Sequence, residues 1–325
     1  MKYLIVDDEH ELYRQMYADL LRTTLYDVEE IHRMQEPKHF KLLFKIQFDS
    51  RLNAHFLVPF KSIWDSYYDL DHYDFKPDEK YTVLLLNGSV KAHYSRRFFL
   101  NLKRKNPNVR LVLIMHDSVA NARSIQTIRM FDVFDKIFSF DAMDCERYGF
   151  EKIYQTFSKP DFVEKNPELH SKAFFIGRGD DRTELLKTVF RKITSAVDGC
   201  KFFITDVDES KVEKIKDVVF NKRMSYTDEL RMAYNTDCIF EIVRKGQTGV
   251  SLRACEAVVF NKKFITNNAS IKDMPFYDSR YMRIISDPDD LDIDFIKAEM
   301  DVDYGNEEYF SPLLILKRLE EIYGR

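Results

Sequence analysis

The residues from Asn235 to Asn268 are those whose types and spacing point most directly to chemistry. This segment, NTDCIFEIVRKGQTGVSLRACEAVVFNKKFITNN, predicts a strand, a loop with Gly246 and Gly249, a helix that begins near Val250, and a strand that ends in Thr-Asn-Asn. Glycines let the backbone approach a ligand closely, and a helix N-terminus presents unpaired N–H groups and the positive end of the helix dipole. The loop and the start of the helix therefore predict a binding site for a diphosphate.

Two side chains on the predicted helix could complete this site. Arg253 lies one turn into the helix, so its guanidinium can reach the same anion, and Glu256 shares its face three residues later. A carboxylate there is placed to accept hydrogen bonds from a ribose diol. The residues alone leave an alternative open, in which Arg253 and Glu256 form a surface ion pair and Gly246 serves only the turn.

A second glycine loop occurs in FFIGRGDDRTEL. Gly177 and Gly179 follow a predicted strand and precede a predicted helix, and Arg178 between them could offer a cation to a diphosphate. A glycine turn of this kind is equally consistent with a purely structural role.

Polar residues also follow two predicted strands of the first half, where open α/β sheets place their ligands. These residues are Asp7, Asp8, His116 and Asp117. His116 is the first candidate for a general base because histidine titrates near neutrality, and Asp117 and Asp8 come next. Asp8 also has a structural explanation, since it could cap the following helix with Glu11 completing a capping box.

The segment from Asn87 to His116 contains no acidic residue. Within it, residues 91–105 interleave basic side chains with Tyr94, Phe98 and Phe99. A helix of this composition is suited to an anionic membrane surface or to a lipid-diphosphate acceptor. The alternative is an ordinary helix that places Phe98, Phe99 and Leu102 in the core.

Short apolar runs that alternate with helical patterns must position these residues. Such alternation is typical of open, mostly parallel sheets with helices on both faces. The predicted strands are 3–6, 81–86, 109–115, 136–140, 172–177, 200–205, 237–243 and 263–267. The predicted helices are 9–25, 95–105, 182–196, 227–234, 250–260 and 312–323.

The length of 325 residues predicts two domains. The polar stretch SKPDFVEKNPELHSK, with Pro160 and Pro167, is the best candidate for a linker between them. We therefore expect one domain at 1–165 and another at 166–325, the latter ending in an amphipathic helix.

The amino-acid composition, net charge and cysteine spacing exclude several classes of protein. With 45% hydrophobic and 32% charged residues, the chain is expected to fold, and a net charge of -4 gives it no general attraction to nucleic acid. The four cysteines lack the spacing of a zinc site. There is no run of about 18 apolar residues and no apolar segment typical of a signal peptide, so we expect a cytoplasmic protein that could work at the inner face of the plasma membrane.

The stretch GQTGVSLRACEAVVFNKKFITNN resembles nucleotide-sugar-dependent glycosyltransferases of the GT-B type, and within them the bacterial enzymes that build capsule and lipopolysaccharide chains. FDKIFSFDAMDCERYGF looks like the last strand and turn of the acceptor domain in such enzymes. The resemblance implies two Rossmann-like domains that face each other across a cleft, with the C-terminal helix packing back toward the N-terminal domain.

In that family the second domain binds the nucleotide sugar and the first binds the acceptor. Carried over to this sequence, the resemblance implies donor-binding roles for Gly177, Arg178, Gly179, Gln247, Thr248, Gly249, Arg253 and Glu256. Many relatives have two glutamates eight positions apart. Here Glu256 matches the second, but Thr248 stands at the first, so the signature of retaining enzymes is absent and inversion is favoured.

The expected substrates are a nucleotide sugar and a glycan or lipid-linked glycan acceptor, without nucleic acid. Arg178, Arg253 and the helix dipole could stabilise the departing diphosphate, so no essential metal and no other cofactor are expected. Three Asp-x-Asp triplets, at 206–208, 292–294 and 301–303, could hold a metal, but two of them lie in a stretch dense with acids that looks like solvated loop.

Two other functions remain as alternatives. A phosphate-accepting receiver, or another non-enzymatic binding protein, would use the acid pair Asp7 and Asp8 with Asp49 as phosphoacceptor at the end of a strand. A sugar-nucleotide epimerase of the same two-domain fold would use the donor site without an acceptor.

Overall fold

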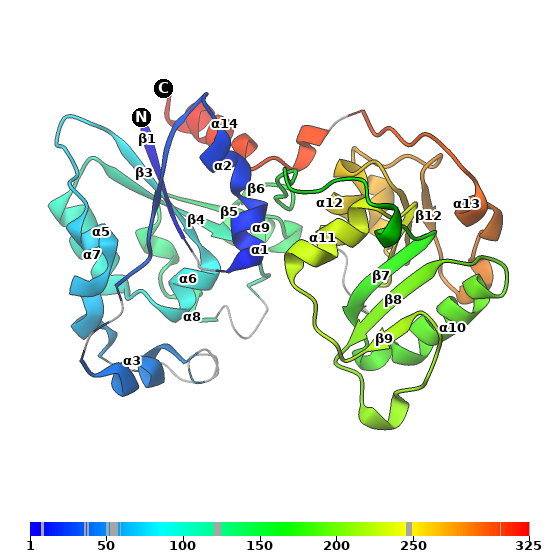
Figure 1. Ribbon diagram of the computed structural model, residues 1–325. Coiled ribbons are helices and arrows are strands. Elements are labelled where there is room, and N and C mark those ends of the chain that lie inside the picture. The colour runs from blue at the N-terminus through cyan, green and yellow to red at the C-terminus, as the bar shows by residue number, and fades with distance from the viewer. Residues whose placement is uncertain are drawn as a thin grey trace. The chain divides into compact units, whose positions relative to one another are not determined.

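The computed structural model describes residues 1–7, 10–35, 37, 39–49, 52, 58, 60–119, 125–244, 249–305 and 307–324. The chain forms two compact units, one made of Met1–Tyr154 with Pro312–Arg325 and the other of Gln155–Ser311 (Figure 1). Each unit is built on one six-stranded parallel sheet.

The sheet of the first unit has the strand order β2-β1-β3-β4-β5-β6. Its strands are β1 (Lys2–Val6), β2 (Asp27–Ile31), β3 (Tyr81–Leu86), β4 (Val109–Met115), β5 (Lys136–Ser139) and β6 (Glu151–Lys152). Its α-helices are α1 (Glu11–Met16), α2 (Ala18–Arg22), α3 (Lys41–Phe48), α5 (Asp69–His72), α6 (Asn87–Ala92), α7 (Arg96–Lys105), α8 (Ile125–Ile128), α9 (Ala142–Tyr148) and α14 (Leu313–Tyr323). Short 3-10 helices lie at η1 (Lys61–Tyr67) and η3 (Phe131–Val133).

The sheet of the second unit has the order β12-β11-β10-β7-β8-β9. Its strands are β7 (Ala173–Arg178), β8 (Cys200–Thr205), β9 (Val218–Phe220), β10 (Cys238–Glu241), β11 (Lys263–Thr266) and β12 (Met282–Ile284). Its α-helices are α10 (Thr183–Thr194), α11 (Tyr226–Tyr234), α12 (Leu252–Val259) and α13 (Ile293–Lys297). Its 3-10 helices are η4 (Pro167–Leu169), η5 (Asp180–Arg182), η6 (Glu209–Lys211), η7 (Ala269–Asp273), η8 (Pro288–Asp290) and η9 (Glu307–Phe310).

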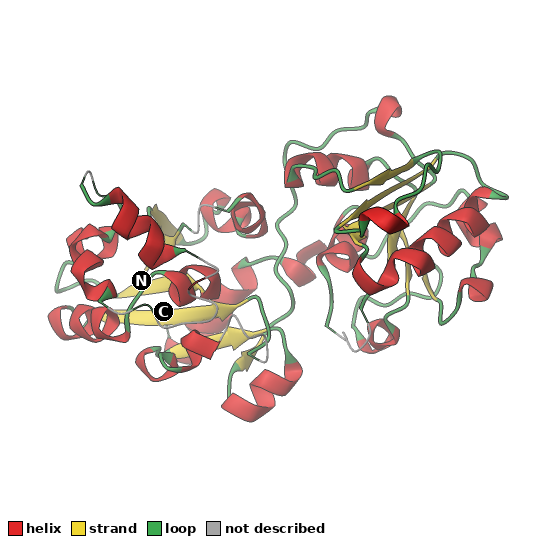
Figure 2. Ribbon diagram, turned by 90° about the horizontal axis from the view of Figure 1, so that it is seen from below, coloured by secondary structure: helices red, strands yellow, loops and turns green. Residues whose placement is uncertain are grey.

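The central strands are largely apolar and buried, as expected for a sheet with helices on both faces (Figure 2). All six residues of β3 and all four of β10 are buried. Each unit has its own hydrophobic core around these strands. The predicted α/β class with two Rossmann-like domains is confirmed.

The compact units differ from the expected ranges 1–165 and 166–325. Residues 155–165 belong to the second unit, where Phe157 is buried and its N–H donates to the carbonyl of Phe310 at 2.8 Å. Asn235 holds the same segment, since its Nδ2 donates to the carbonyl of Glu164 at 3.0 Å. The proline-containing stretch is therefore packed against a domain and is not a free linker.

The last helix belongs to the first unit, in keeping with the expectation that it packs back toward the N-terminal domain. Arg318 of α14 forms an ion pair with Glu151 at 2.7 Å, and the Tyr323 hydroxyl donates to the carbonyl of Asp135 at 3.1 Å. The first unit is thus completed by a segment that follows the whole second unit in sequence.

The placement of Asp49 removes the basis of the receiver alternative. The segment before it forms helix α3, not a strand, and Asp49 is the exposed C-cap residue of that helix. A phosphoacceptor must end a strand beside the acid pair, and Asp49 does not meet this requirement.

The N-cap of α1 also differs from the prediction. Helix α1 begins at Glu11, and the N-cap is His10, whose Nδ1 accepts from the N–H of Leu12 at 3.3 Å. Glu11 is therefore the first helical residue and cannot complete a capping box three residues after the cap. Asp8 lies outside the described residues.

Of the two alternatives for residues 91–105, the structure agrees with an ordinary helix whose aromatic residues lie in the core, and this helix is α7. Phe98, Phe99 and Leu102 are buried in the core, as is Tyr94. Several of its cations have acidic partners, with Arg96 on Asp132 and Lys103 on Asp135. The aromatic side chains that suggested a membrane contact at 91–105 are thus committed to the fold.

Candidate functional site

The carboxyl ends of the second sheet, within the second unit, form the main candidate site. In an open α/β sheet, ligands bind where the strand order reverses, because the loops diverge there. This reversal lies between β7 and β10, which are neighbours in the sheet. The chain leaves β7 at Gly179 and β10 at Ile242, so the two glycine loops of the sequence start from adjacent strands.

Three arginines gather at this point. The Arg178 Nε lies 2.7 Å from the Asp206 carboxylate and 3.5 Å from that of Asp180, and Arg244 forms an ion pair with the same Asp180. The guanidinium of Arg182 donates to the carbonyls of Ile242, after β10, and Arg178, in β7.

The three arginines of this cluster (Arg178, Arg182 and Arg244) differ in burial and in their partners. Burial, together with the neighbouring Arg244, lowers the pKa of Arg182 below its ordinary value. The buried Nε of Arg182 has no hydrogen-bond partner among the described residues. Arg178 and Arg244 are exposed, so an anion can reach them from solvent.

Gly179 lets the loop after β7 pass against β8. A Cβ at this position would lie 2.5 Å from the Thr183 Oγ1 and 2.7 Å from a Val207 methyl. Real Cβ atoms do not make contacts this short, so only glycine fits without a shift. The glycine is thus required by close packing behind the arginine cluster.

The N-terminus of α12 is fixed to the ends of β10 and β11 by a buried carboxylate. Ser251, the N-cap, accepts from the N–H of Ala254 and donates its hydroxyl to Glu241. Thr266 donates to the other oxygen of Glu241 at 2.5 Å. Burial raises the pKa of Glu241, while these two hydroxyl groups oppose the rise.

The Asn-Asn pair after β11 holds the ends of the loop that connects β10 to α12. The Asn267 Oδ1 accepts from the N–H of Val243 at 2.6 Å, and the Asn268 Nδ2 donates to the carbonyl of Gly249 at 3.1 Å. Residues 245–248, which include the expected ligands Gln247 and Thr248, lie outside the described residues.

Arg253 and Glu256 lie together on α12, but inside the protein. The Glu256 side chain is 0% exposed, accepts from Arg253 at 2.5 Å and also accepts from the Tyr226 hydroxyl at 3.3 Å. Arg253 also binds Glu229 of α11 at 2.7 Å. The two residues therefore form a largely buried pair that joins α11 to α12.

Burial raises the pKa of Glu256 to about 7, against the opposing influence of Arg253. The same burial would lower the pKa of Arg253, but the carboxylates of Glu256 and Glu229 outweigh it and raise that pKa. The pair thus shares a buried environment in which the glutamate titrates near neutrality.

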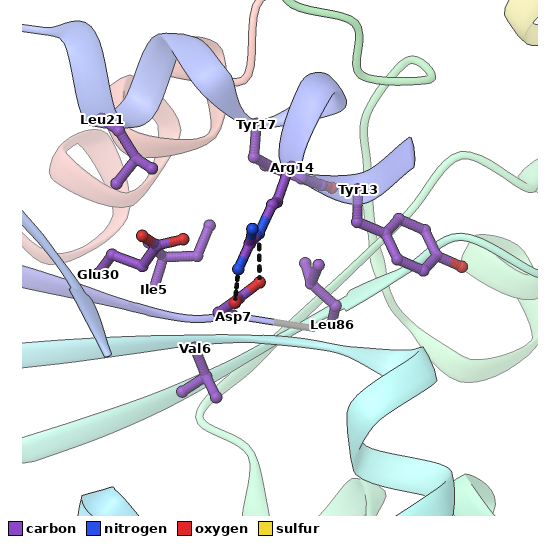
Figure 3. A pocket seen from close by; sticks show the side chains of 9 residues that line it. All are labelled: Ile5, Val6, Asp7, Tyr13, Arg14, Tyr17, Leu21, Glu30 and Leu86. Carbon is purple, nitrogen blue, oxygen red and sulfur yellow. Dashed lines mark hydrogen bonds and ion pairs between the residues drawn. The ribbon is translucent and has the colours of Figure 1, made fainter. Parts of the chain in front are cut away.

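The carboxyl ends of the first sheet, within the first unit, gather a second group of predicted site residues. The strand order reverses between β1 and β3, and Asp7 directly follows β1. Its buried carboxylate is bound by Arg14 of α1, with the Nε at 3.3 Å and an Nη at 2.5 Å (Figure 3). The cavity lined by these two side chains with Tyr13 and Tyr17 offers about 20 Å³ to water-sized molecules, enough for one water and too little for a sugar.

His116 follows β4 at the same edge of the sheet. Its Nε2 lies 2.9 Å from the Tyr17 hydroxyl, and its ring lies against Tyr13 with the centroids 4.8 Å apart. The Asn87 side chain, directly after β3, accepts from the backbone N–H of His116 at 3.3 Å. Asp117 is half-buried beside it.

Solved structures of other proteins share this two-unit arrangement. An alpha-glucosyltransferase in complex with UDP-glucose and DNA matches with a TM-score of 0.59 at 10% identity, over 99% of this chain and 98% of that one. A putative UDP-N-acetylglucosamine 2-epimerase from Listeria monocytogenes gives 0.53 at 10% identity, over 99% and 96%. An Anabaena protein in complex with UDP and glucose gives 0.53 at 9% identity, over 99% of both chains.

The chain has the GT-B fold. At these identities the likeness establishes the fold alone. No protein-family model matches the sequence, and no curated protein matches it.

On this GT-B scaffold, the structure brings some predicted site residues together and leaves others apart. Gly177, Arg178, Gly179 and Gly249 lie at the carboxyl ends of the second sheet, and His116 and Asp117 lie at those of the first. Glu256 is fully buried on α12, and Arg253 beside it is 16% exposed.

Sequence reasoning missed Arg182, Arg244 and Glu241 as parts of this site. Arg182 follows the glycine turn by three residues and Arg244 precedes Gly246 by two, so their closeness to both loops was a usable signal. Glu241 stands within an apolar run, CIFEIV, where a buried acid needs partners.

The described residues also bear on metal binding and membrane insertion. Among the described residues, no group of three or more His, Cys, Asp and Glu side chains is arranged to hold a metal ion. Within the same part of the chain, no helix combines the length and the apolar character needed to cross a membrane.

Proposed function

We propose that the protein is a glycosyltransferase that moves a sugar from a nucleotide-sugar donor to a glycan or lipid-linked glycan acceptor. The observation that carries the proposal is the arginine cluster at the switch point of the second sheet, beside the N-terminus of α12. Guanidinium groups and free N–H groups at a helix N-terminus both bind diphosphates well.

A nucleoside diphosphate would compete with the present partners of the cluster. Arg178 and Arg244 now share Asp180, and Arg178 also pairs with Asp206. A diphosphate would offer both arginines several charged acceptor oxygens on one ligand. The same cations would stabilise the diphosphate as it leaves, which is why we propose a transfer that needs no metal.

For the acceptor side we propose His116 as the general base of an inverting reaction. His116 follows β4 with its Nε2 2.9 Å from the Tyr17 hydroxyl, and an imidazole can take the proton of an acceptor hydroxyl near neutral pH. The threonine at position 248, in place of the first glutamate of the retaining pattern, supports inversion. The resemblance of residues 246–268 to capsule and lipopolysaccharide enzymes supports a cytoplasmic role in making cell-surface polysaccharide.

The first test is a thermal-shift comparison with UDP, GDP, CMP and dTDP. A nucleotide that binds only the folded state raises the melting temperature. We expect a shift with one nucleoside diphosphate that is lost in Arg178→Gln/Arg244→Gln. The matched control is Arg191→Gln, another exposed arginine paired with an acid in the same unit. No shift with any of the nucleotides, or a shift that survives in the double variant, would contradict the proposal.

The second test separates transfer from epimerisation. Nucleotide sugars that carry the nucleotide identified by the first test are each incubated with the protein without an acceptor, and the sugar is analysed. Slow hydrolysis without interconversion agrees with a transferase, whereas conversion to an epimer without an acceptor identifies an epimerase.

Loss of activity in the presence of EDTA, restored by a divalent cation, would contradict metal independence.

A further inference from the structure

A patch on the first unit exposes large apolar side chains to solvent. It is formed by α3 with the residue before it and by the start of η1. The members are Phe40, Leu42, Leu43, Ile46, Phe60 and Ile63. Phe40, Phe60 and Leu42 are 76%, 75% and 73% exposed, whereas soluble proteins seldom expose apolar side chains in such groups without a binding role. We name this group the α3 patch.

The side of α3 opposite the α3 patch packs against η1, and this packing keeps the α3 patch turned toward solvent. Phe44 and Phe48 pack their rings against Trp64 of η1, with centroids 5.3 and 6.3 Å apart, and the indole N–H of Trp64 donates to Gln47. Phe44, Gln47 and Phe48 therefore anchor the helix, and Leu42 and Ile46, four residues apart, point to the other side. In Figure 1, α3 lies at the margin of its unit, apart from the strands.

Both phenylalanines stand at special backbone positions. Phe40 is the N-cap of α3 with φ 60°, and Phe60 is the N-cap of η1 with φ 64°. A left-handed backbone is unfavourable for a bulky residue, and strain of this kind is often found at functional surfaces. The two rings are thus presented to solvent by strained turns, with no compensating burial.

The charge around the α3 patch is positive although the chain as a whole carries -4. Among the described residues of 39–63, Lys41 and Lys45 lie on α3, Lys61 begins η1, and the one acid is Asp49. Lys41 and Lys45 flank the exposed leucines and form no ion pair with the described residues. Apolar side chains interleaved with lysines fit the boundary between the headgroups and acyl chains of an anionic bilayer.

We infer that the α3 patch is a docking surface for a membrane that contains anionic lipids. Leu42, Leu43, Ile46 and the two phenylalanines enter the interface, and the lysines bind the lipid phosphates. This assignment replaces α7, whose aromatic residues are buried, and it does not depend on the proposed transfer activity.

The test is flotation of the full-length protein with vesicles of phosphatidylcholine and phosphatidylglycerol, compared with vesicles of phosphatidylcholine alone. We expect binding to the anionic vesicles that falls at least tenfold in Leu42→Glu/Ile46→Glu and weakens in Lys41→Gln/Lys45→Gln and in high salt. The matched control is Leu25→Glu/Met143→Glu, which changes two other exposed apolar residues of the same unit, Leu25 being 81% exposed.

The outcomes that follow would contradict membrane docking by the α3 patch. Absence of vesicle binding, or equal binding by wild type and Leu42→Glu/Ile46→Glu, would do so directly. Sedimentation of the wild type as a dimer that Leu42→Glu/Ile46→Glu dissociates, without vesicle binding, would assign the α3 patch to a second copy of the chain. Circular dichroism of each variant confirms that it remains folded.

Discussion

The buried pair of Arg253 and Glu256 gives the protein a titrating group near neutrality. Because burial raises the pKa of Glu256 from 4.5 to about 7, the folded state holds a proton in this range that the unfolded chain has lost. This contribution to stability is fully present below pH 4.5 and is lost as the pH rises through 7. The groups that face Glu256 are Arg253, Glu229 and Tyr226.

We therefore expect Glu256→Gln to flatten the dependence of stability on pH. Between pH 5 and 7.5 the free energy of unfolding of the wild type should fall by on the order of 2 kcal/mol more than that of the variant. Glutamine keeps the size of the side chain and one acceptor oxygen, and it cannot titrate. Urea unfolding at a series of pH values measures both curves, and parallel curves would show that Glu256 does not titrate in this range.

At the scale of residues, the sequence identified the right helix but not the environment of its side chains. The spacing of Arg253 and Glu256 correctly placed them on one face. Whether that face points to a ligand or to α11 depends on Glu229 and Tyr226, which lie far away in sequence. Long-range partners of this kind cannot be inferred from local spacing.

At the scale of elements, Gly179 decides how closely the loop after β7 approaches β8. An alanine would force its Cβ against Thr183 and Val207, so we expect Gly179→Ala to lower the free energy of unfolding by about 1 to 3 kcal/mol. The shifted loop should also weaken nucleotide binding. The measurements are urea unfolding and the thermal shift with the preferred nucleotide.

The matched control for this prediction is Gly149→Ala. Gly149 has φ +70°, but a Cβ there would meet no atom within 4 Å, so only the backbone cost of about 1 kcal/mol is expected, without an effect on nucleotide binding. Equal losses in the two variants would mean that crowding at Gly179 is relieved by small movements.

The strands that the sequence did not predict all lie at the edges of the two sheets. β2, β6, β9 and β12 are the edge strands of the two sheets, whereas all eight inner strands were predicted. Inner strands are covered on both faces and read as apolar runs, but an edge strand such as DVEEI in β2 is half exposed and carries acids. Pattern reasoning therefore recovers the centre of a parallel sheet and misses its margins.

At the scale of the whole molecule, the path of the chain was the feature least accessible to sequence reasoning. The second unit is one continuous segment, and the first is split between 1–154 and 312–325. An amphipathic helix at the end of a chain shows that it packs against something, but its pattern does not say against which domain. Buried Ile315, Leu316 and Leu319 supply the answer only through their contacts in space.

This path predicts how the protein can be divided. Residues 155–311 contain the whole second sheet and its core, so we expect them to fold alone with a cooperative thermal transition. Residues 1–154 alone should be markedly less stable than 1–154 joined to 312–325 by about eight Gly/Ser residues, because α14 covers apolar surface of the first unit. Eight residues are enough because the two segments that follow residue 154 and precede residue 312 lie close together. The N–H of Phe157 donates a hydrogen bond to the carbonyl of Phe310.

Thermal unfolding followed by circular dichroism compares the fragments, with 1–165 and 166–325 as the alternative division. In 166–325 the apolar face of α14 has lost its partner, so this fragment should aggregate where 155–311 does not. Equal stability of 1–154 with and without the last helix would show that α14 adds nothing to the first core. Arg318 and Tyr323 contact the first unit, so α14 should pack in the same way in the joined fragment. Leu316→Ala should therefore lower the free energy of unfolding of that fragment by about 2 to 5 kcal/mol, as expected for a fully buried leucine.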